Sequence, residues 1–435
     1  MNSRRLNRRA RAVLLLGSGA LAVFLGFFAA RNALAAHYLG LDSRRGYEQA
    51  VGLEPHNPRN WYLLGRSYLY DLEQPDPVKA VSALRKSVEL DPYSAEALLD
   101  LAIAYDSEGD TKEARAALLS AQRVYPLSAD VAWSFGNFLL RQGEAEAGFA
   151  ELHKALELDP KRAAEAFSRA MRMQADPNLV LDKVVPANAD CYLPILRILS
   201  DAGEMETAQL VWARLLGLGH KVPLREAVPF FDALIHERRP DEAARRWPEA
   251  VAIMDHPPPA DPAGSLVWDG GFESGFAGGG FSWLFTPANR NVQISFDRAE
   301  KHSGEQSLRV LFNGHENINF EDACHQIVPE PGQRYLLTAW VKTQSLTSSE
   351  GVRLQISAFS GLGVVATQSE EIHGTAPWTQ VSLAWRAPED SGFGRVCLRR
   401  KMSDMPGSDI EGAAWVDDVT MMPVSASPSG AAPLP

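Results

Sequence analysis

Pairs of adjacent carboxylates are the residues in this 435-residue chain that come nearest to a catalytic constellation. Glycoside hydrolysis, for example, needs two carboxylates that flank one bond. The adjacent pairs are Glu321-Asp322, Glu370-Glu371 and Asp417-Asp418. Because neighbouring residues on a strand point to opposite faces, no such pair can flank a single bond. We therefore expect no enzyme activity, and a polysaccharide hydrolase with an unrecognised site is the less favoured alternative.

Other signatures of catalysis or nucleic-acid binding are missing from the sequence. It contains no HExxH, GxSxG or phosphate-loop motif. The net charge of -11 argues against nucleic acid as the main ligand, because a phosphate backbone needs a positive face. Three cysteines cannot build a disulfide scaffold or a four-cysteine zinc site. With 46% apolar and 22% charged residues the composition is that of a globular protein, and the length predicts about two to four folded units.

The N-terminus predicts a membrane anchor. The basic residues of the head, residues 1–11, are Arg4, Arg5, Arg8, Arg9 and Arg11. Residues 12–30 carry no charge, and at about 1.5 Å per residue a helix over them spans roughly 28 Å, close to the bilayer core. The positive-inside rule keeps the head in the cytoplasm, which predicts a single-pass protein of a bacterial inner membrane with a periplasmic bulk. The alternative is a signal peptide cleaved at the A-x-A pattern of residues 33–35, leaving a secreted or periplasmic protein.

Residues 43–254 repeat with a 34-residue period. Pro92, Pro126 and Pro160 lie 34 residues apart, and each follows a helical pattern. Small residues recur where two helices would cross, with large apolar residues between them. The pattern is clear over 58–160, breaks between residues 176 and 188, and returns in weaker form over 190–254. Each unit is a helical hairpin that needs its neighbours to bury its apolar face, so the units must stack into a solenoid.

This region resembles the tetratricopeptide repeat family. The resemblance implies a superhelix whose concave groove, lined mainly by the first helix of each hairpin, binds protein partners or peptides. The residues expected to line the groove are Tyr62, Arg66, Leu99, Ile103, Trp133 and Asn137. Packing between hairpins is the alternative role of Tyr62 and Trp133. The basic and asparagine residues with which some relatives clamp a C-terminal carboxylate do not form that pattern here, so we do not expect capture of a free chain end.

The hydrophobic period changes from helical to two after the repeats. Residues 255–265 are rich in proline and predict a semi-rigid linker. Beyond them come short alternating segments such as QSLRVLF (306–312) and VRLQISAF (352–359), separated by glycine and proline, which indicate an antiparallel sandwich. Residues 424–435 predict a flexible tail.

Residues 266–423 resemble the jelly-roll carbohydrate-binding modules, families four and nine in particular. The resemblance rests on the ordered motifs LVWDGGFESG, HSGEQSLRV, PGQRYLLTAWVKT, APWTQVSLAW and AWVDDVTM. It implies a glycan-binding domain, although similar jelly rolls also serve as spacers or bind proteins. The expected fold class is thus multidomain: an N-terminal transmembrane helix, an all-α tetratricopeptide solenoid, then an all-β antiparallel jelly-roll sandwich.

Strand alternation predicts which residues face a glycan. In VRLQISAF the apolar residues point inward, which leaves Arg353 and Gln355 outward, and the same parity puts Arg399 outward. An arginine-rich face would suit a glycan with acidic groups better than a neutral chain. Three rings are placed to stack on a sugar: Trp283, Phe320 and Phe359. We expect Trp283 to do so; a solvated face without a ligand is the alternative.

Two further expectations concern a metal and a disulfide. In the family that the sandwich resembles, a structural calcium ion often lies between the glutamate of the first motif and the aspartate of the last strand. That position implies Glu273 and Asp417 here, with Asp418 as the alternative. Cys324 and Cys397 fall on separate predicted strands with the same parity, and an exported location permits a disulfide between them. Two independent thiols are the alternative.

Together these features predict a membrane-anchored scaffold or adaptor of the bacterial envelope. We expect it to bind protein partners through its repeats and a glycan through its jelly roll, in the assembly or export of surface polysaccharide. The alternative is a purely protein–protein adaptor in which the jelly roll is a spacer.

Overall fold

The computed structural model describes residues 8–286, 290–360, 363–390, 392–405 and 408–424, so most of the predicted basic head and C-terminal tail lies outside the described residues. The chain divides into two compact units, Met1–Pro186 and Ala187–Pro435. This boundary falls where the 34-residue period breaks in the sequence.

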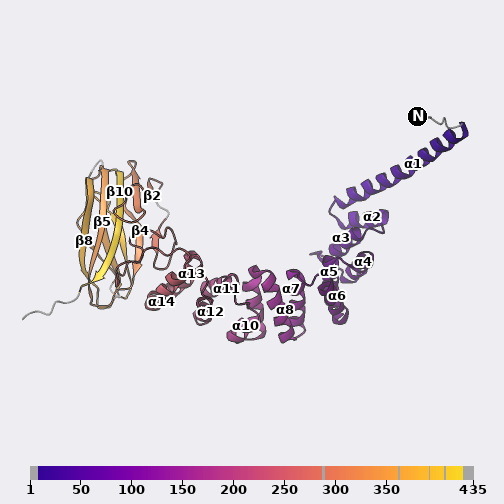
Figure 1. Ribbon diagram of the computed structural model, residues 1–435, viewed down its shortest axis with the longest axis horizontal. Helices are drawn as coiled ribbons and strands as arrows, with labels where there is room; N and C mark the ends of the chain where they lie inside the picture. The colour runs from indigo at the N-terminus through magenta and orange to yellow at the C-terminus, as the bar shows by residue number, and fades with distance from the viewer. Residues whose placement is uncertain (1–7, 287–289, 361–362, 391, 406–407, 425–435) are drawn as a thin grey trace, which may run out of the picture. The chain divides into compact units, whose positions relative to one another are not determined.

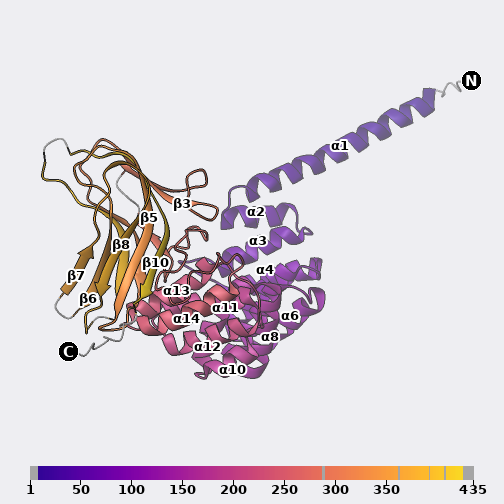
Figure 2. The same cartoon turned by 60° about the vertical axis from the view of Figure 1, so that its left-hand side comes forward.

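A long helix opens the first unit. α1 (Arg8–Leu39) contains a stretch, Arg11–Leu39, that is long and apolar enough to cross a membrane, with a mean hydropathy of 2.3. Its C-terminal part packs against α2 (Arg44–Leu53), where Ala35 is only 1% exposed. Gly46 permits this approach, because a Cβ at that position would lie 2.4 Å from the Tyr38 carbonyl oxygen. The apolar helix therefore runs without a break into the first helical hairpin (Figure 2).

The rest of the first unit is built from helical hairpins. Its helices are α3 (Pro58–Leu69), α4 (Pro77–Leu90), α5 (Ala95–Glu108), α6 (Thr111–Val124), α7 (Ala129–Arg141), α8 (Ala145–Leu158), α9 (Ala163–Met173) and α10 (Pro177–Lys183). The helix α3 packs against α4, α5 against α6, and α7 against α8, which is the order that the 34-residue period predicts. Small residues allow close crossing, since a Cβ at Gly65 would lie 2.5 Å from Leu84 Cγ. Side-chain caps start several helices, as where Ser94 Oγ accepts the Ala97 N–H.

The second unit begins with helices that continue the repeat pattern. These are α11 (Ala189–Asp201), α12 (Met205–Gly217), α13 (Leu224–His236) and α14 (Pro240–Ile253). The helix α11 packs against both α12 and α13, and α13 packs against α14. Aromatic rings fill their core: the Trp212 and Phe230 rings lie 5.2 Å apart, and those of Phe231 and Trp247 5.0 Å apart. The weak pattern over 190–254 thus also encodes helical hairpins.

Two antiparallel five-stranded sheets form the rest of the second unit (Figure 1). The first sheet has the order β1 (Trp283–Phe285), β4 (Phe320–Ile327), β9 (Gly394–Arg400), β6 (Arg353–Ser360) and β7 (Gly363–Gln368). The second has the order β2 (Val292–Asp297), β3 (Ser307–Asn313), β10 (Glu411–Pro423), β5 (Arg334–Leu346) and β8 (Gly374–Arg386). Alternate residues of both sheets fill one apolar core, as at Leu337, Ile356 and Val396. This is the all-β antiparallel sandwich that the alternating segments predict.

Side chains from α13 and α14 contact the sandwich within the second unit. The Trp247 ring lies 5.4 Å from the Trp268 ring and 5.8 Å from the Phe281 ring. The Gly280 N–H donates to Asp232 Oδ1 at 2.7 Å. These contacts join elements on either side of the proline-rich segment 255–265, which the sequence predicts to be a spacer.

Candidate functional site

The structure brings the six predicted groove residues into equivalent positions. They are the fifth and ninth residues of three successive first helices: Tyr62 and Arg66 in α3, Leu99 and Ile103 in α5, and Trp133 and Asn137 in α7. Arg66 and Ile103 are exposed, whereas Tyr62, Leu99 and Trp133 are half-buried. Because the residues repeat with the helices, they form a row along one face of the first unit.

A cluster of polar side chains lies at one end of this row. Tyr70 Oη donates to Asp100 Oδ1 at 2.6 Å, and Arg66 Nε lies 3.3 Å from Asp100 Oδ2. The Arg66 guanidinium lies 5.6 Å from the centroid of the Tyr62 ring and 5.3 Å from that of Tyr70. Burial raises the pKa of Tyr62 to about 12, because the phenolate would be poorly solvated there.

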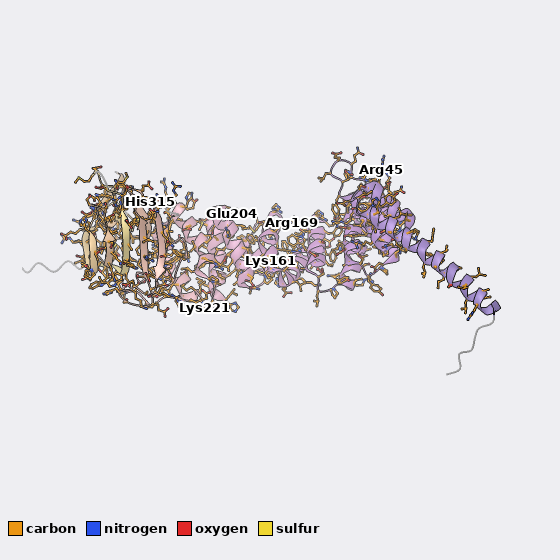
Figure 3. The ribbon with its side chains drawn as sticks, turned by 90° about the horizontal axis from the view of Figure 1, so that it is seen from above. Arg45, Lys161, Arg169, Glu204, Lys221 and His315 are labelled. Carbon is orange, nitrogen blue, oxygen red and sulfur yellow. A yellow bond between two sulfur atoms is a disulfide. The ribbon has the colours of Figure 1, made fainter. Side chains whose placement is uncertain are left out.

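A tryptophan between two arginines lies farther along the row. The Arg162 and Arg169 guanidinium carbons lie 5.4 and 5.1 Å from the centroid of the Trp133 ring (Arg169 is labelled in Figure 3). Asn137 differs from the exposed position that we expected, since it is only 7% exposed. Its amide is used internally, with Nδ2 donating to the Trp133 carbonyl at 2.8 Å and Oδ1 accepting from Arg169 at 2.7 Å.

Interactions between successive repeats hold the row in place. Besides the Arg66–Asp100 contact, Arg141 Nη2 lies 2.7 Å from Asp106 Oδ2, and Arg162 lies 2.5 Å from Asp130. Sequence reasoning missed these partners, although their separations of 32 to 35 residues follow the repeat period. The arginines are therefore paired with carboxylates. The aromatic and aliphatic side chains of the row are the part of this surface that a partner could bury.

The predicted glycan residues lie on neighbouring strands of the first sheet. Arg353 in β6 is directly opposite Arg399 in β9, and Gln355 is directly opposite Cys397. Alternation therefore predicts correctly which of these residues come together. Gln355 is only 6% exposed, and its Nε2 lies 3.3 Å from Glu321 Oε1.

The arginines of this face are not free cations, which corrects the expectation of an acidic glycan. Arg353 pairs with Glu350 at 2.5 Å and also with Glu371, and its side chain is only 13% exposed. Arg399 Nε lies 3.6 Å from Glu321 Oε2, and its side chain is 11% exposed. Since carboxylates from neighbouring segments neutralise these charges, the face has no surplus of positive charge to attract an anion.

The ring expected to stack on a sugar is in the core. Trp283 is 4% exposed, its Nε1 donates to the Asp269 carbonyl at 3.0 Å, and its ring lies 4.7 Å from that of Phe272. Phe320 is fully buried as well. Phe359, the remaining candidate, is 39% exposed and has the same strand parity as Gln355. Trp283 was misplaced because β1 is three residues long and gives no alternation to read.

A disulfide joins two neighbouring strands of this sheet, β4 and β9. Cys324 in β4 and Cys397 in β9 are directly opposite, with their Cα atoms 4.1 Å apart, and their sulfurs are bonded. Glu321 brings a carboxylate oxygen close to both sulfurs. This group cannot bind a metal as thiolates while the disulfide is intact, so its role is to connect the strands that carry the face.

The two residues predicted to hold calcium approach one another near Gly271. A Cβ on that glycine would lie 3.9 Å from both Glu273 Oε1 and Asp417 Oδ1. Asp417 is fully buried, and it accepts the N–H groups of His302 at 2.8 Å and Ser303 at 3.1 Å. Burial raises the pKa of Asp417 to about 6, which means that its charge is only partly compensated.

Glu273 also lines an acidic hollow, whose carboxylates are of the kind that a hard cation prefers. Asp261, Asp269, Glu273 and Asp418 line a hollow of about 460 Å³, and no lysine or arginine is among the described residues that line it. Carboxylate and carbonyl oxygens are the donors that calcium prefers. Three backbone N–H groups already donate to the Asp417 carboxylate, those of His302 and Ser303 to Oδ2 and that of Asp418 to Oδ1, so carbonyl oxygens would have to supply most of the ligands.

A family model and several solved structures of low sequence identity are similar to parts of this chain. Residues 71–133 match the family model of the tetratricopeptide repeat. Among solved structures, the chain is similar to the MamA protein, with 21% identity, a TM-score of 0.31, and coverage of 36% of this chain and 87% of that one. No curated protein matches the sequence.

Carbohydrate-binding modules are also among the similar solved structures. A CBM22-1 xylan-binding domain from Paenibacillus barcinonensis has 15% identity and a TM-score of 0.27, and the match covers 38% of this chain and 94% of that one. A family 22 carbohydrate-binding module from Clostridium thermocellum has 17% identity and a TM-score of 0.29, with coverage of 38% and 96%. The family match over residues 71–133 and the two antiparallel sheets by themselves give tetratricopeptide repeats followed by an antiparallel jelly-roll sandwich.

Proposed function

We propose that the protein is a single-pass, membrane-anchored adaptor of the bacterial envelope, and not an enzyme. The helix α1 would be the anchor in the inner membrane, with a cytoplasmic N-terminus and an exported bulk. The repeats would bind a protein partner, and the sandwich a glycan, in the assembly or export of surface polysaccharide. The observation that carries this proposal is the row of side chains at the fifth and ninth positions of α3, α5 and α7.

The chemistry of the row supports a protein partner. Ile103 is 37% exposed, and Trp133 and Tyr62 are half-buried rings, so a partner can bury apolar area there at little conformational cost. The paired arginines hold the rings in fixed orientations and supply hydrogen-bond donors at the edge of the row. Such a combination of rigid rings and flanking arginines is typical of binding hot spots.

The size of the native complex tests this proposal. We expect membranes that contain the wild-type chain to show it in a larger assembly on native gels, and the combined variant Ile103→Ala and Trp133→Ala to release it. Leu119→Ala is the matched control, since Leu119 in α6 is 43% exposed but lies outside the row. Equal assembly by all three proteins would contradict a partner site on the row.

An uncleaved anchor is favoured by the packing of α1. Cleavage after the A-x-A pattern would cut within the helix and beside Ala35, which is buried against α2. The shortened chain would lose the helix on which α2 packs. We therefore expect the mature protein to begin before residue 33, as mass spectrometry of the membrane-extracted chain would show; a mature N-terminus at residue 36 would establish the signal-peptide alternative.

A neutral glycan suits the sandwich better than an acidic one. Phe359 offers an exposed ring, and the partly exposed Glu321 and Arg395 offer an acceptor and donors for hydroxyl groups on the same sheet. The pairing of the arginines favours the purely protein-binding alternative, because a face whose charged groups already pair with one another needs no ligand. Phe359→Ala should lower binding on a glycan array, whereas Leu336→Ala on the other sheet, 38% exposed, should not. Absence of any wild-type binding would favour the spacer alternative.

A structural calcium ion is part of the same proposal. Glu273 and Asp417 would hold it with backbone carbonyls, and its charge would compensate the buried carboxylate. We expect calcium to raise the melting temperature of the second unit and EDTA to lower it, with both effects abolished in Glu273→Gln. A melting temperature that is independent of calcium would show that the N–H groups around Asp417 suffice.

A further inference from the structure

A hollow of about 680 Å³ lies inside the second unit, between α14 and the segment that leads into the sandwich. From α14 it is lined by Trp247 and Val251, and from the segment before β1 by Trp268 and Phe281, among others. Residues 257–264 of the proline-rich segment supply a third wall, so we call it the linker hollow. None of its lining residues belongs to the groove row or to the sheet face that was predicted to bind a glycan.

Direct contacts hold the walls of the linker hollow in place. The Trp247 and Trp268 rings lie 5.4 Å apart with their planes at 82°. At the end of α14, Val222 forms a parallel bridge with Met254, which fixes the adjacent Lys221 beside the helix. The hollow is therefore formed by packing within the unit, and a ligand would not have to order its walls on binding.

The walls of the linker hollow are largely apolar. Apart from the indole N–H groups, polar side-chain atoms among its described lining residues belong to Lys221, Asp261 and Ser265. The Asp261 carboxylate already accepts the main-chain N–H groups of Asp269 at 2.7 Å and Gly270 at 3.0 Å, and Ser265 Oγ also bonds to the main chain. A sugar would leave most of its hydroxyl groups unpaired against such walls, so a ligand with an apolar body fits better.

Two groups at the linker hollow call for an oxygen acceptor. Lys221 is the one cation among the described residues that line it, and this side chain is exposed (labelled in Figure 3). Its Nζ donates to the Ala252 carbonyl at 2.7 Å, which uses one of three ammonium protons and holds the charge at the rim. Trp247 is only 5% exposed, and its Nε1–H has no acceptor among the described residues, although a buried N–H normally has one.

We propose that the linker hollow binds an amphiphile whose apolar chain lies against Trp247 and Trp268 and whose acidic head group pairs with Lys221. The proposal goes beyond the adaptor function, because it concerns a small molecule and uses neither of the proposed binding surfaces. The volume is within the range of about 300–1,000 Å³ that is typical of small-molecule sites. Lysine acts as a point charge and suits a carboxylate or a phosphate, so a long-chain fatty acid and a prenyl phosphate share the required chemistry.

Photoaffinity labelling of the full chain in phosphatidylcholine nanodiscs tests this proposal. The probe is hexadecanoic acid that carries a diazirine in its chain, and mass spectrometry of the digest locates the label. We expect label within residues 244–268, displaced by unlabelled hexadecanoic acid or farnesyl phosphate; the acid that displaces it at the lower concentration identifies the source. Neutral hexadecanol should need a concentration about two- to fivefold higher than hexadecanoic acid, the effect of one exposed charge pair. Label confined to α1, or equal displacement by the acid and the alcohol, would overturn the proposal.

Three variants separate the linker hollow from the bilayer and from a general effect of charge. Lys221→Gln should raise the probe concentration for half-maximal labelling about two- to fivefold and remove the preference for the acid over the alcohol. Lys161→Gln, the same change at an exposed lysine of the first unit, should do neither. Val251→Trp fills the hollow and should abolish the label there while any label in α1 persists; hydrogen exchange in α14 would check that this variant is folded. Unchanged half-maximal labelling in Lys221→Gln, or undiminished label in folded Val251→Trp, would overturn the site.

Discussion

Substitution of Leu118 by alanine should destabilise the first unit and leave the stability of the second unchanged. Leu118 in α6 is 3% exposed and belongs to the core that joins the hairpins of the first unit. Truncation of such a leucine costs about 2–5 kcal/mol, because the lost apolar transfer and the residual cavity add together. For a unit of this size each kcal/mol shifts the melting temperature by about 2–4 °C. We therefore expect a fall of roughly 5–15 °C for the first unit.

A neighbouring leucine provides the control for this substitution. Leu119 has the same side chain, is in the same helix and is 43% exposed, so Leu119→Ala removes equal volume without opening a cavity. Hydrogen-exchange mass spectrometry of the full chain in detergent would measure protection helix by helix. We expect Leu118→Ala to lower protection in α3–α8 and to leave α11–α14 and the sheets unchanged, because repeat units support mainly their neighbours.

Two results would refute this reasoning. Equal effects of the two substitutions would show that burial does not decide the cost, and hence that the hairpin core is misassigned. A parallel loss of protection in the second unit would show that the chain unfolds as one cooperative body, in conflict with a boundary near residue 186.

Three further predictions concern the second unit. Burial raises the pKa of Asp417 to about 6, above its unfolded value near 3.9. In calcium-free buffer the melting temperature should therefore fall as the pH rises from about 4 to about 7, because the unfolded chain loses this proton first. Asp417→Asn should show a smaller fall over the same range. Arg399→Ala should lower the free energy of unfolding by about 1–3 kcal/mol in urea titration, because its hydrogen bonds are lost in a poorly exposed site, and Arg395→Ala, 41% exposed, should cost less. Reduction of the Cys324–Cys397 disulfide, or its replacement by two serines, should cost about 2–4 kcal/mol in the same assay, and an unchanged urea midpoint would contradict its structural role.

The repeats and the sandwich were predictable because their geometry imposes a period on the sequence. A solenoid must return to the same crossing point every 34 residues, so the prolines and the small residues at crossings recur. Strand alternation likewise predicts that Arg353, Gln355 and Arg399 come together, and their register agrees. Each of these features depends on residues that are close in sequence or regularly spaced.

The sequence analysis was wrong where a residue's role depends on partners from other segments of the chain. Alternation shows that Arg353 points away from the core, but the carboxylates that neutralise it come from the preceding and following segments and have no fixed spacing. Trp283 belongs to a strand too short to show alternation, and its partner Asp269 is in a loop.

Photo-crosslinking from the row in the first unit is the most direct test of the central claim, that this row holds a protein partner. A photoreactive phenylalanine analogue would replace Ile103 in one strain and Leu119 in another, at sites that are 37% and 43% exposed. We predict that illumination of intact cells attaches one defined envelope protein to position 103, and that Trp133→Ala abolishes this product. Crosslinks of equal yield and identity from both positions, or no product from position 103, would contradict the account.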